Sequence, residues 1–315
     1  MDKTHRYPSQ NSIWKRFIME NKGELRSNFK KLWRHLPYII DMRNSARPIC
    51  LTLHITSNCN LDCIFCYIKN RDKTEELDYE KLVNFIKIIK PKSVQLTGGE
   101  PCIYPHINYL ISFLASNNIK IGMFTNGIYL RTIMHQLHYF DWLRVSINSY
   151  IDKDVDFIDP DYPKRLGYVY IKHKNSPHIK ELKEKLKKFM DNHRGSYLKI
   201  MQDILEPSEI DIENDPERKI IIQKPVLYKN YKGKCYMGYL KPYLNADGLI
   251  YACVSTINVQ TRTRNKNKAI GDIDHPSNLL IYRDIVMDCE QCRFWDRNEF
   301  IEYINKEEVE DEDFL

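Results

Sequence analysis

His54-Ile-Thr-Ser-Asn-Cys59-Asn-Leu-Asp-Cys63-Ile-Phe-Cys66-Tyr-Ile-Lys69 contains three cysteines, four and then three positions apart. Three thiolates held this closely suit a soft metal site, and they are one ligand short of a closed tetrahedral set. One coordination position is therefore left for a ligand that is not protein. Residues 51–56 alternate apolar and polar side chains, which predicts a strand that ends at the cysteines. Folds of the α/β class place their chemistry at that end of a strand.

The spacing Cys59-x3-Cys63-x2-Cys66, with Phe65 just before the last cysteine, resembles the motif of the radical S-adenosylmethionine (SAM) enzymes. In that family three cysteines hold a 4Fe–4S cluster, and SAM binds the fourth iron. The resemblance implies that the three cysteines bind such a cluster here and that Phe65 lies beside the adenine of SAM. For the triplet alone, a zinc loop completed by a distant ligand is the alternative.

Length and composition indicate one large and one smaller hydrophobic core. The 315 residues are 43% hydrophobic and 29% charged, which is typical of a globular protein. No apolar run approaches the about 18 residues of a membrane span. The first residues lack the apolar core of a signal peptide, so we expect a cytoplasmic protein. In that compartment nine cysteines favour metal sites over disulfides.

The net charge of +6 conceals two oppositely charged ends. Residues 1–49 carry eleven Lys or Arg against four Asp or Glu, with large apolar residues at helical spacing. They are predicted to form a basic helical extension that packs on the following domain, with membrane or nucleic-acid binding as the alternative. Residues 299–315 carry eight acidic residues against one lysine and are predicted to be a disordered tail.

Between residues 50 and 206 strand and helix patterns alternate, which is typical of parallel βα units. The predicted strands are 51–57, 93–97, 120–125, 141–147, 166–172 and 197–203. Helical patterns follow Asp78, Pro105, Tyr129 and His178. Six such units make an incomplete barrel, in agreement with the partial (β/α)6 TIM-like barrel of the radical SAM family. The predicted fold class is therefore α/β.

Thr97-Gly98-Gly99-Glu100-Pro101 follows the second predicted strand. Two glycines let a backbone approach a ligand closely, and Glu100 offers a carboxylate to a cationic group. The family carries a Gly-Gly-Glu motif at this place. The resemblance implies that Gly98, Gly99 and Glu100 bind the amino end of the methionine part of SAM. Taken alone, a Gly-Gly pair is a common turn.

Small polar residues end the third and fourth predicted strands, in Phe124-Thr-Asn126-Gly127 and Val145-Ser146-Ile-Asn148. The family commonly uses polar residues at these places for the ribose and carboxylate of SAM. The resemblance therefore implies that SAM contacts Asn126, Ser146 and Asn148. The alternatives are an Asn-Gly turn and an Asn helix cap.

A change of composition after Glu206-Pro207 predicts a domain boundary, with residues 207–298 as a second, small α+β domain. Two pairs of cysteines there complete a tetrahedral ligand set: Cys235, Cys253, Cys289 and Cys292. Their spacing, Cys-x12-Gly-x4-Cys and then Cys-x2-Cys, resembles the Twitch domain, a shortened SPASM domain. The resemblance implies a second, auxiliary 4Fe–4S cluster, and zinc is the alternative.

Cys50 and Cys102 are left outside both sets. Free cysteines are usually small buried hydrophobes. Cys102 stands two residues beyond Glu100, however, and related peptide epimerases use a free cysteine as a hydrogen-atom donor. Cys102 is therefore the candidate catalytic residue.

The resemblance implies that SAM is cleaved reductively to methionine and a 5′-deoxyadenosyl radical, which takes a hydrogen atom from the substrate. A cluster with four cysteine ligands has no free iron and suits accepting an electron. We therefore expect net oxidation of a small biosynthetic molecule, with an electron donor such as flavodoxin or ferredoxin. The alternatives are epimerisation or crosslinking of a ribosomally made peptide and, from another class, a zinc-stapled nucleic-acid-binding module.

Overall fold

The computed structural model describes residues 35–44, 46–153, 157, 165–193, 195–204, 206, 210–223, 229–258 and 261–305. Its strands are β1 (Cys50–His54), β2 (Ser93–Thr97), β3 (Lys120–Thr125), β4 (Phe140–Ser146), β5 (Leu166–Lys172), β6 (Tyr197–Gln202), β7 (Ile220–Ile222), β8 (Lys229–Lys234), β9 (Tyr243–Leu244), β10 (Leu249–Tyr251), β11 (Ile257–Asn258), β12 (Thr263–Arg264), β13 (Ala269–Asp272) and β14 (Val286–Cys292).

Its α-helices are α3 (Leu36–Ile40), α4 (Tyr79–Ile89), α5 (Ile107–Ser116), α6 (Asn148–Asp152), α7 (Ile179–Asn192), α8 (Met237–Leu240) and α9 (Trp295–Asn305). The 3-10 helices are η1 (Asp41–Arg43), η2 (Pro101–Ile103), η3 (Leu130–Tyr139), η4 (Lys266–Lys268) and η5 (Pro276–Leu280). Within the described residues, no helix is both long enough and apolar enough to cross a membrane.

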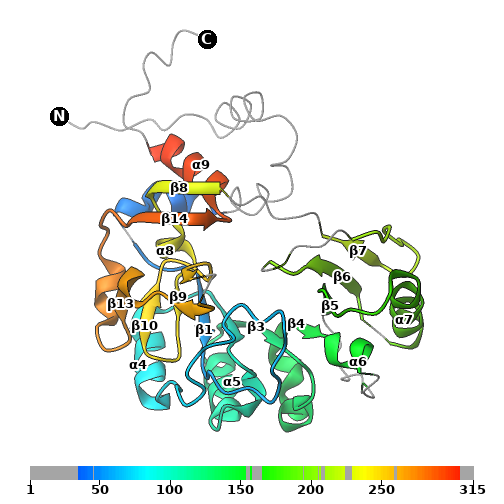
Figure 1. The fold of residues 1–315 in the computed structure, drawn as a ribbon. Coiled ribbons are helices and arrows are strands. Elements are labelled where there is room, and N and C mark those ends of the chain that lie inside the picture. The colour runs from blue at the N-terminus through cyan, green and yellow to red at the C-terminus, as the bar shows by residue number, and fades with distance from the viewer. Residues whose placement is uncertain are drawn as a thin grey trace, which may run out of the picture.

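Ten strands of the described chain form one sheet, in the order β13-β10-β9-β1-β2-β3-β4-β5-β6-β7. The strands from β9 to β7 run parallel to their neighbours, whereas β10 is antiparallel to both β9 and β13. The sheet does not close, and β13 and β7 lie at its two ends, on opposite sides of Figure 1. The predicted α/β fold with a partial barrel is confirmed.

All six predicted barrel strands are present within a few residues of their predicted bounds. Asp78 caps α4 as predicted, because its carboxylate accepts the N–H of Lys81 at 2.8 Å. The predicted helix at residues 129–138 is a 3-10 helix, η3, rather than an α-helix. Such segments cross back over the sheet between successive parallel strands. The strands therefore run in one direction, and their carboxyl ends lie along the same edge of the sheet.

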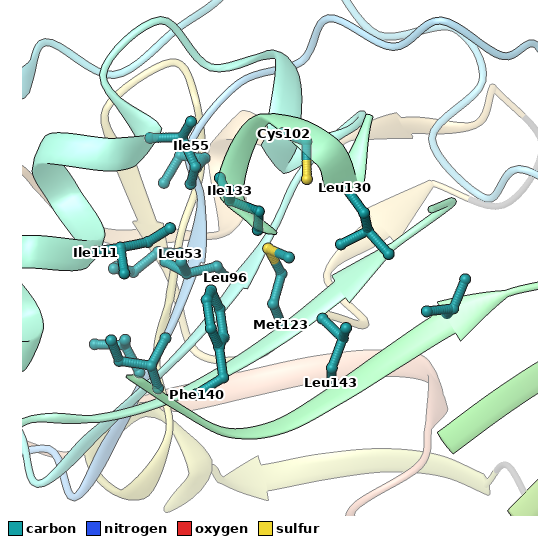
Figure 2. Close-up of a cluster of buried hydrophobic side chains, with 14 of the residues drawn as sticks. Leu53, Ile55, Leu96, Cys102, Ile111, Met123, Leu130, Ile133, Phe140 and Leu143 are labelled. Carbon is teal, nitrogen blue, oxygen red and sulfur yellow. The ribbon is translucent and has the colours of Figure 1, made fainter. Parts of the chain in front are cut away.

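The main core lies between the strands and the crossover helices. Figure 2 shows Leu53 and Ile55 from the first βα unit near Leu96 of β2 and Met123 of β3. These side chains are fully buried in one hydrophobic cluster. Each side chain comes from a strand or from the residues that directly follow it. Burial of these apolar side chains holds the strands in place, and this fixes the position of the sheet edge at their carboxyl ends.

A second core joins the start of the described chain to its end. Ile39 and Met42 are buried with Met237 of α8 and with Phe300 and Ile301 of α9. Figure 1 shows α9 beside the β8–β14 pair, above the barrel strands. Part of the predicted extension thus packs on the rest of the chain, while residues 1–34 lie outside the described residues.

The predicted disordered tail, 299–315, needs a correction. Residues 299–305 belong to α9, because Phe300 and Ile301 are 1% and 0% exposed and pack into the second core. Charge composition concealed these two apolar positions. Residues 306–315 lie outside the described residues.

The predicted division at residue 206 remains a prediction, but the sheet crosses it. Strand β7 pairs with β6 after that point, and β9 pairs with β1 from within the second predicted domain. Strands β9 and β10 form an antiparallel hairpin, with Gly248 at φ +82° in its turn.

Candidate active site

The loop after β1 contains Cys59, Cys63 and Cys66, all partly buried. The N–H of Cys66 donates to the carbonyl of Cys63 at 3.1 Å and closes a turn between them. The N–H of Leu61 donates to Cys59 Sγ at 3.4 Å, and Arg71 Nη1 donates to Cys66 Sγ at 3.5 Å. Two of the sulfurs therefore accept hydrogen bonds, which favours thiolate and metal-bound cysteine.

The three thiols also affect one another. Burial, followed by the nearby thiols of Cys66 and Cys59, raises the pKa of Cys63 to about 11. Thiolates placed this closely repel one another, and a bound cation removes that repulsion. In the described ranges no group of three or more His, Cys, Asp or Glu side chains has the geometry to hold a metal ion.

Gly98 and Gly99 hold the start of this loop against the end of β2. The N–H of Gly99 donates to the carbonyl of Thr56 at 2.7 Å. A Cβ on Gly98 would lie 2.5 Å from the Thr56 oxygen, and one on Gly99 would lie 2.0 Å from the Asn58 oxygen. Glycine is therefore required here for contact with the protein's own backbone. Both glycines remain partly exposed on the other side.

Glu100 is fully buried, and its carboxylate joins the second strand to the third. Oε1 accepts from Thr125 Oγ1 at 2.7 Å and from the N–H of Cys102 at 3.1 Å. Oε2 accepts from the N–H of Asn126 at 2.7 Å. Burial raises the pKa of Glu100, and these hydrogen bonds lower it. Asn126 in turn donates to Asn60 at 2.8 Å, so Glu100 positions the cysteine loop through Asn126.

Ser146 and Asn148 lie at the end of β4, as predicted, but in different surroundings. Asn148 is 3% exposed, accepts from the N–H of Ile171 at 2.9 Å and donates to the Ile171 carbonyl at 2.8 Å. Its amide therefore fixes β5 to the start of α6. Ser146 is partly exposed and is the better placed of the two to meet a ligand.

Phe65 contacts a polar network that the sequence did not reveal. Its ring centroid lies 5.2 Å from that of His173, just after β5. His173 Nε2 lies 3.0 Å from Asp152 Oδ2, and Tyr170 donates to Asp152 Oδ1 at 2.7 Å. The predicted adenine neighbour is therefore backed by a buried histidine that a carboxylate orients.

Cys102 is 5% exposed and lies in the main core, where Figure 2 shows it near Leu130 and Ile133. Its Sγ lies 3.9 Å from Thr125 Oγ1. Burial, followed by the Glu100 carboxylate, raises the pKa of Cys102 far above its usual range. These are the surroundings of a packing residue, and its role as a hydrogen-atom donor remains a prediction. Cys50 opens β1, at the opposite end from the cysteine loop.

The second cysteine set comes together from three places in the fold. One cysteine follows β8, one follows β10, and two lie on β14 opposite β8: Cys235, Cys253, Cys289 and Cys292. Burial raises the pKa of all four thiols, and the Cys253 thiol adds to this effect on the other three. The N–H of Ser255 donates to Cys253 Sγ at 3.3 Å. Four sulfurs thus lie close enough together to influence one another.

Residues 53–198 match the family model of the radical SAM superfamily. In a crystal structure, Streptococcus suis SuiB bound to S-adenosylmethionine has a TM-score of 0.51 at 15% identity, covering 84% of this chain and 75% of that one. Native anSMEcpe with bound AdoMet and Cp18Cys peptide has a TM-score of 0.50 at 14% identity, covering 84% and 85%. Membership of the radical SAM superfamily is supported.

Among curated relatives, the GTP 3′,8-cyclase of Clostridium botulinum is 31% identical over 107 residues. That match covers 31% of this chain and 34% of the cyclase. The chain covers about a third of the length of the curated relatives that it matches.

The residues of both sites fit the iron–sulfur chemistry expected of a radical SAM protein. Three thiols on one loop fit the cluster that binds SAM, and four thiols fit a fully ligated cluster. Three sulfurs accept N–H hydrogen bonds, those of Cys59, Cys66 and Cys253. Such bonds stabilise negative charge on cluster ligands.

Sequence reasoning missed several residues that hold the candidate site together. These are Asn60, Arg71, Asp152 and His173. Asn60 carried a usable signal, since a polar residue between two ligand cysteines is well placed to fix the loop. The contact of Asp152 with His173 joins two different βα units, which a local pattern does not report.

Proposed function

We propose that this protein is a radical SAM enzyme that catalyses the net oxidation of a small biosynthetic molecule with the help of an auxiliary 4Fe–4S cluster. The observation that carries the proposal is the presence of two separate groups of thiols in one molecule. Three lie on the loop after β1, and four come from the residues after β8 and β10 and from β14.

In this proposal Cys59, Cys63 and Cys66 hold the cluster that binds SAM. When bound, that cluster supplies the electron that splits SAM into methionine and a 5′-deoxyadenosyl radical, which abstracts a hydrogen atom from the substrate. The hard chemistry belongs to the cofactors, and the barrel orients the reactants and excludes water.

The proposed SAM contacts divide into two groups. Gly98, Gly99 and Ser146 are partly exposed at the ends of β2 and β4, and Phe65 is partly exposed on the loop. We assign direct contacts to these four and to Asn126, with Phe65 beside the adenine. Two predicted contacts, Glu100 and Asn148, use their side chains within the protein. They act as positioning residues for the same site.

The second set completes the proposed reaction. Removing a hydrogen atom leaves a substrate radical, and loss of one further electron and one proton gives the oxidised product. We assign Cys235, Cys253, Cys289 and Cys292 to an auxiliary cluster that accepts this electron, because four cysteine ligands leave no iron open for substrate. An external donor such as flavodoxin or ferredoxin supplies the first electron.

The test is iron and sulfide analysis of the anaerobically reconstituted protein, with an absorption spectrum. We expect about eight irons in the wild type and about four in a Cys59/Cys63/Cys66→Ala variant. A Cys50/Cys102→Ala variant is the matched control and should keep about eight. Incubation of the wild type with SAM and a reductant should release 5′-deoxyadenosine. A colourless protein that binds zinc would overturn the proposal in favour of the zinc-stapled module.

A peptide substrate is the second candidate. It is favoured by the likeness to anSMEcpe, solved with a bound peptide, over 84% of this chain at a TM-score of 0.50. Hydrogen abstraction would then begin an epimerisation or a crosslink. The two candidates are separated by which substrate, a small molecule or a peptide, changes in mass. For a peptide, mass spectrometry separates a crosslink, which removes two hydrogens, from epimerisation, which in deuterated water replaces one hydrogen by deuterium.

A further inference from the structure

A hairpin from the second predicted domain lies against the first cysteine loop. Strands β11 and β12 pair antiparallel, and their basic residues continue into η4. The Thr261 carbonyl accepts from Asn70 Nδ2 at 2.9 Å. Arg262 Nη1 donates to the carbonyl of Ile64, between the second and third cysteines of the loop, at 2.9 Å. The hairpin therefore touches the segment that carries Cys63 and Cys66.

Arg264, at the end of this hairpin, reaches both cysteine sets. Its guanidinium carbon lies 4.1 Å from the ring centroid of Tyr243 and 6.0 Å from that of Tyr67, which directly follows Cys66. Its Nη1 donates to the carbonyl of Val254, which directly follows Cys253, at 2.5 Å. The Arg264 side chain thus lies between Tyr67, the residue after Cys66, and Val254, the residue after Cys253.

The charge of Arg264 is costly in this place. Its Nε and Nη2 atoms are buried and have no acceptor in the described part of the chain. A buried donor without an acceptor destabilises the folded state, and a guanidinium stays charged at any ordinary pH. Stacking on the tyrosine rings offsets part of that cost. A costly charge between two cofactor sites calls for a functional reason.

The position of this charge follows from the geometry. Arg264 Nη1 is hydrogen-bonded to the carbonyl of Val254, the residue after Cys253, and the guanidinium carbon lies 6.0 Å from the ring centroid of Tyr67, the residue after Cys66. A fixed positive charge at this place stabilises negative charge on the groups around it.

We propose that Arg264 is a positioning residue that raises the reduction potential of the auxiliary cluster, so that this cluster accepts the electron lost by the substrate. The inference rests on the proposed function. Reduction adds one electron, and hence one negative charge, to a cluster held by Cys253 and its partners. A fixed cation next to Cys253 stabilises the reduced form and leaves the oxidised form less affected. Arg262 holds the hairpin on the first loop and keeps this cation in place.

The test is an EPR-monitored redox titration of the reconstituted full chain, with iron counted in every sample. Arg264→Gln removes the charge and keeps a polar side chain. We expect the reduction equilibrium constant of the auxiliary cluster to fall at least tenfold, which is about 59 mV for one electron. Arg264→Lys keeps the charge and should change the constant less than threefold. Arg144→Gln is the matched control, since Arg144 stacks on Phe124 and Trp142 within the barrel.

Each outcome decides a different point. Two loaded clusters with unchanged potentials in Arg264→Gln would overturn the role of Arg264 and leave the proposed function intact. A wild type that loads only one cluster would overturn the proposed function and this inference with it. If Arg264→Gln does not load iron, Arg264→Lys decides. Wild-type potentials in Arg264→Lys support the inference, and a tenfold shift in that variant contradicts it.

Discussion

At the scale of single residues, the site depends on polar side chains that bond to the protein rather than to a ligand. Glu100 and Asn148 are both buried, and each joins two strand ends. Glu100 fixes the position of Asn126, and Asn148 fixes β5 to the start of α6. In the proposed function these two side chains therefore act as positioning residues for the groups around them.

Replacing Asn148 by Asp tests this reading. The substitution removes the donor to the Ile171 carbonyl and places a carboxylate near Asp152, whose Oδ2 lies 3.3 Å from Asn148 Nδ2. We expect the free energy of unfolding to fall by about 1–3 kcal/mol or more, because a buried acceptor is left unpaired. Urea unfolding measures this change. Asn118→Asp, at an exposed position, is the control and should change it by less than about 0.5 kcal/mol.

His54 predicts how stability depends on pH. It is 1% exposed at the end of β1, and its Nδ1 lies 2.5 Å from the Tyr243 hydroxyl. Burial, with the charges of Arg264 and Arg71, lowers the pKa of His54 to about 3. Below about pH 6.5 the unfolded chain therefore binds a proton that the folded chain does not bind until about pH 3.

Stability should accordingly fall as pH drops through that window, by up to about 1.4 kcal/mol per pH unit from this histidine. Other histidines titrate as well, so the comparison is with His54→Gln in the same cofactor state. Urea unfolding between pH 7 and 5 should give a smaller loss in the variant. Equal slopes for the two proteins would contradict a neutral buried His54.

At the scale of elements, the close approach of β2 to the cysteine loop is the critical contact. Gly99→Ala would place a Cβ 2.0 Å from the Asn58 oxygen, which is backbone and cannot rotate away. The loop must then move, and the spacing of its three thiols moves with it. We expect this variant to hold about four irons, those of the second set, instead of about eight.

Gly271→Ala is the matched control for this experiment. A Cβ there meets only Ile250 Cδ1, at 3.8 Å, which is an ordinary contact. This variant should keep about eight irons and nearly wild-type stability. Full iron loading in Gly99→Ala would mean that the loop tolerates the displacement, and the assigned role of the glycine would be wrong.

At the scale of the whole molecule, local patterns predicted the barrel well and the connections between its parts poorly. The six strands were predictable because each is a short apolar run with a turn or helix signal on either side, as at Leu51 or Val94. The cysteine sets were predictable because ligand spacing is local within each pair. The two cysteine pairs of the second set come together only when β8 pairs with β14, and these two strands are far apart in the sequence.

Most of the features that the sequence did not reveal are long-range, although Arg71 contacts Cys66 from only a few residues away. Arg264 lies near Tyr67, although most of the barrel segment separates the two residues in the sequence. Asp152 and His173 come together only after β4 and β5 pair. Phe300 was hidden among acidic residues, although it completes a core with Ile39 from near the other end of the chain. Tertiary packing overrode the local signal in each case.

This packing predicts that the barrel and the C-terminal unit unfold together. Strand β9 lies between β1 and β10 in one sheet, and Ile39 and Met42 bury themselves against α8 and α9. Leu244 and Ile250 also belong to the main core, so each core contains residues from both parts. Two tryptophans report on the two parts separately, because Trp142 lies on β4 and Trp295 lies on α9.

We expect urea transitions followed by the two tryptophans to coincide, as they do for a cooperative unit. The measurement uses two variants, each with one of these tryptophans and Phe at the remaining three tryptophan positions. Circular dichroism on both variants checks that the substitutions leave the midpoint unchanged. Because β9 pairs with β1 directly beside the cysteine loop, a common transition would also mean that losing the second core disrupts the first site. An earlier transition at Trp295 alone would instead mean that the barrel, with its cysteine loop, is stable without the second core.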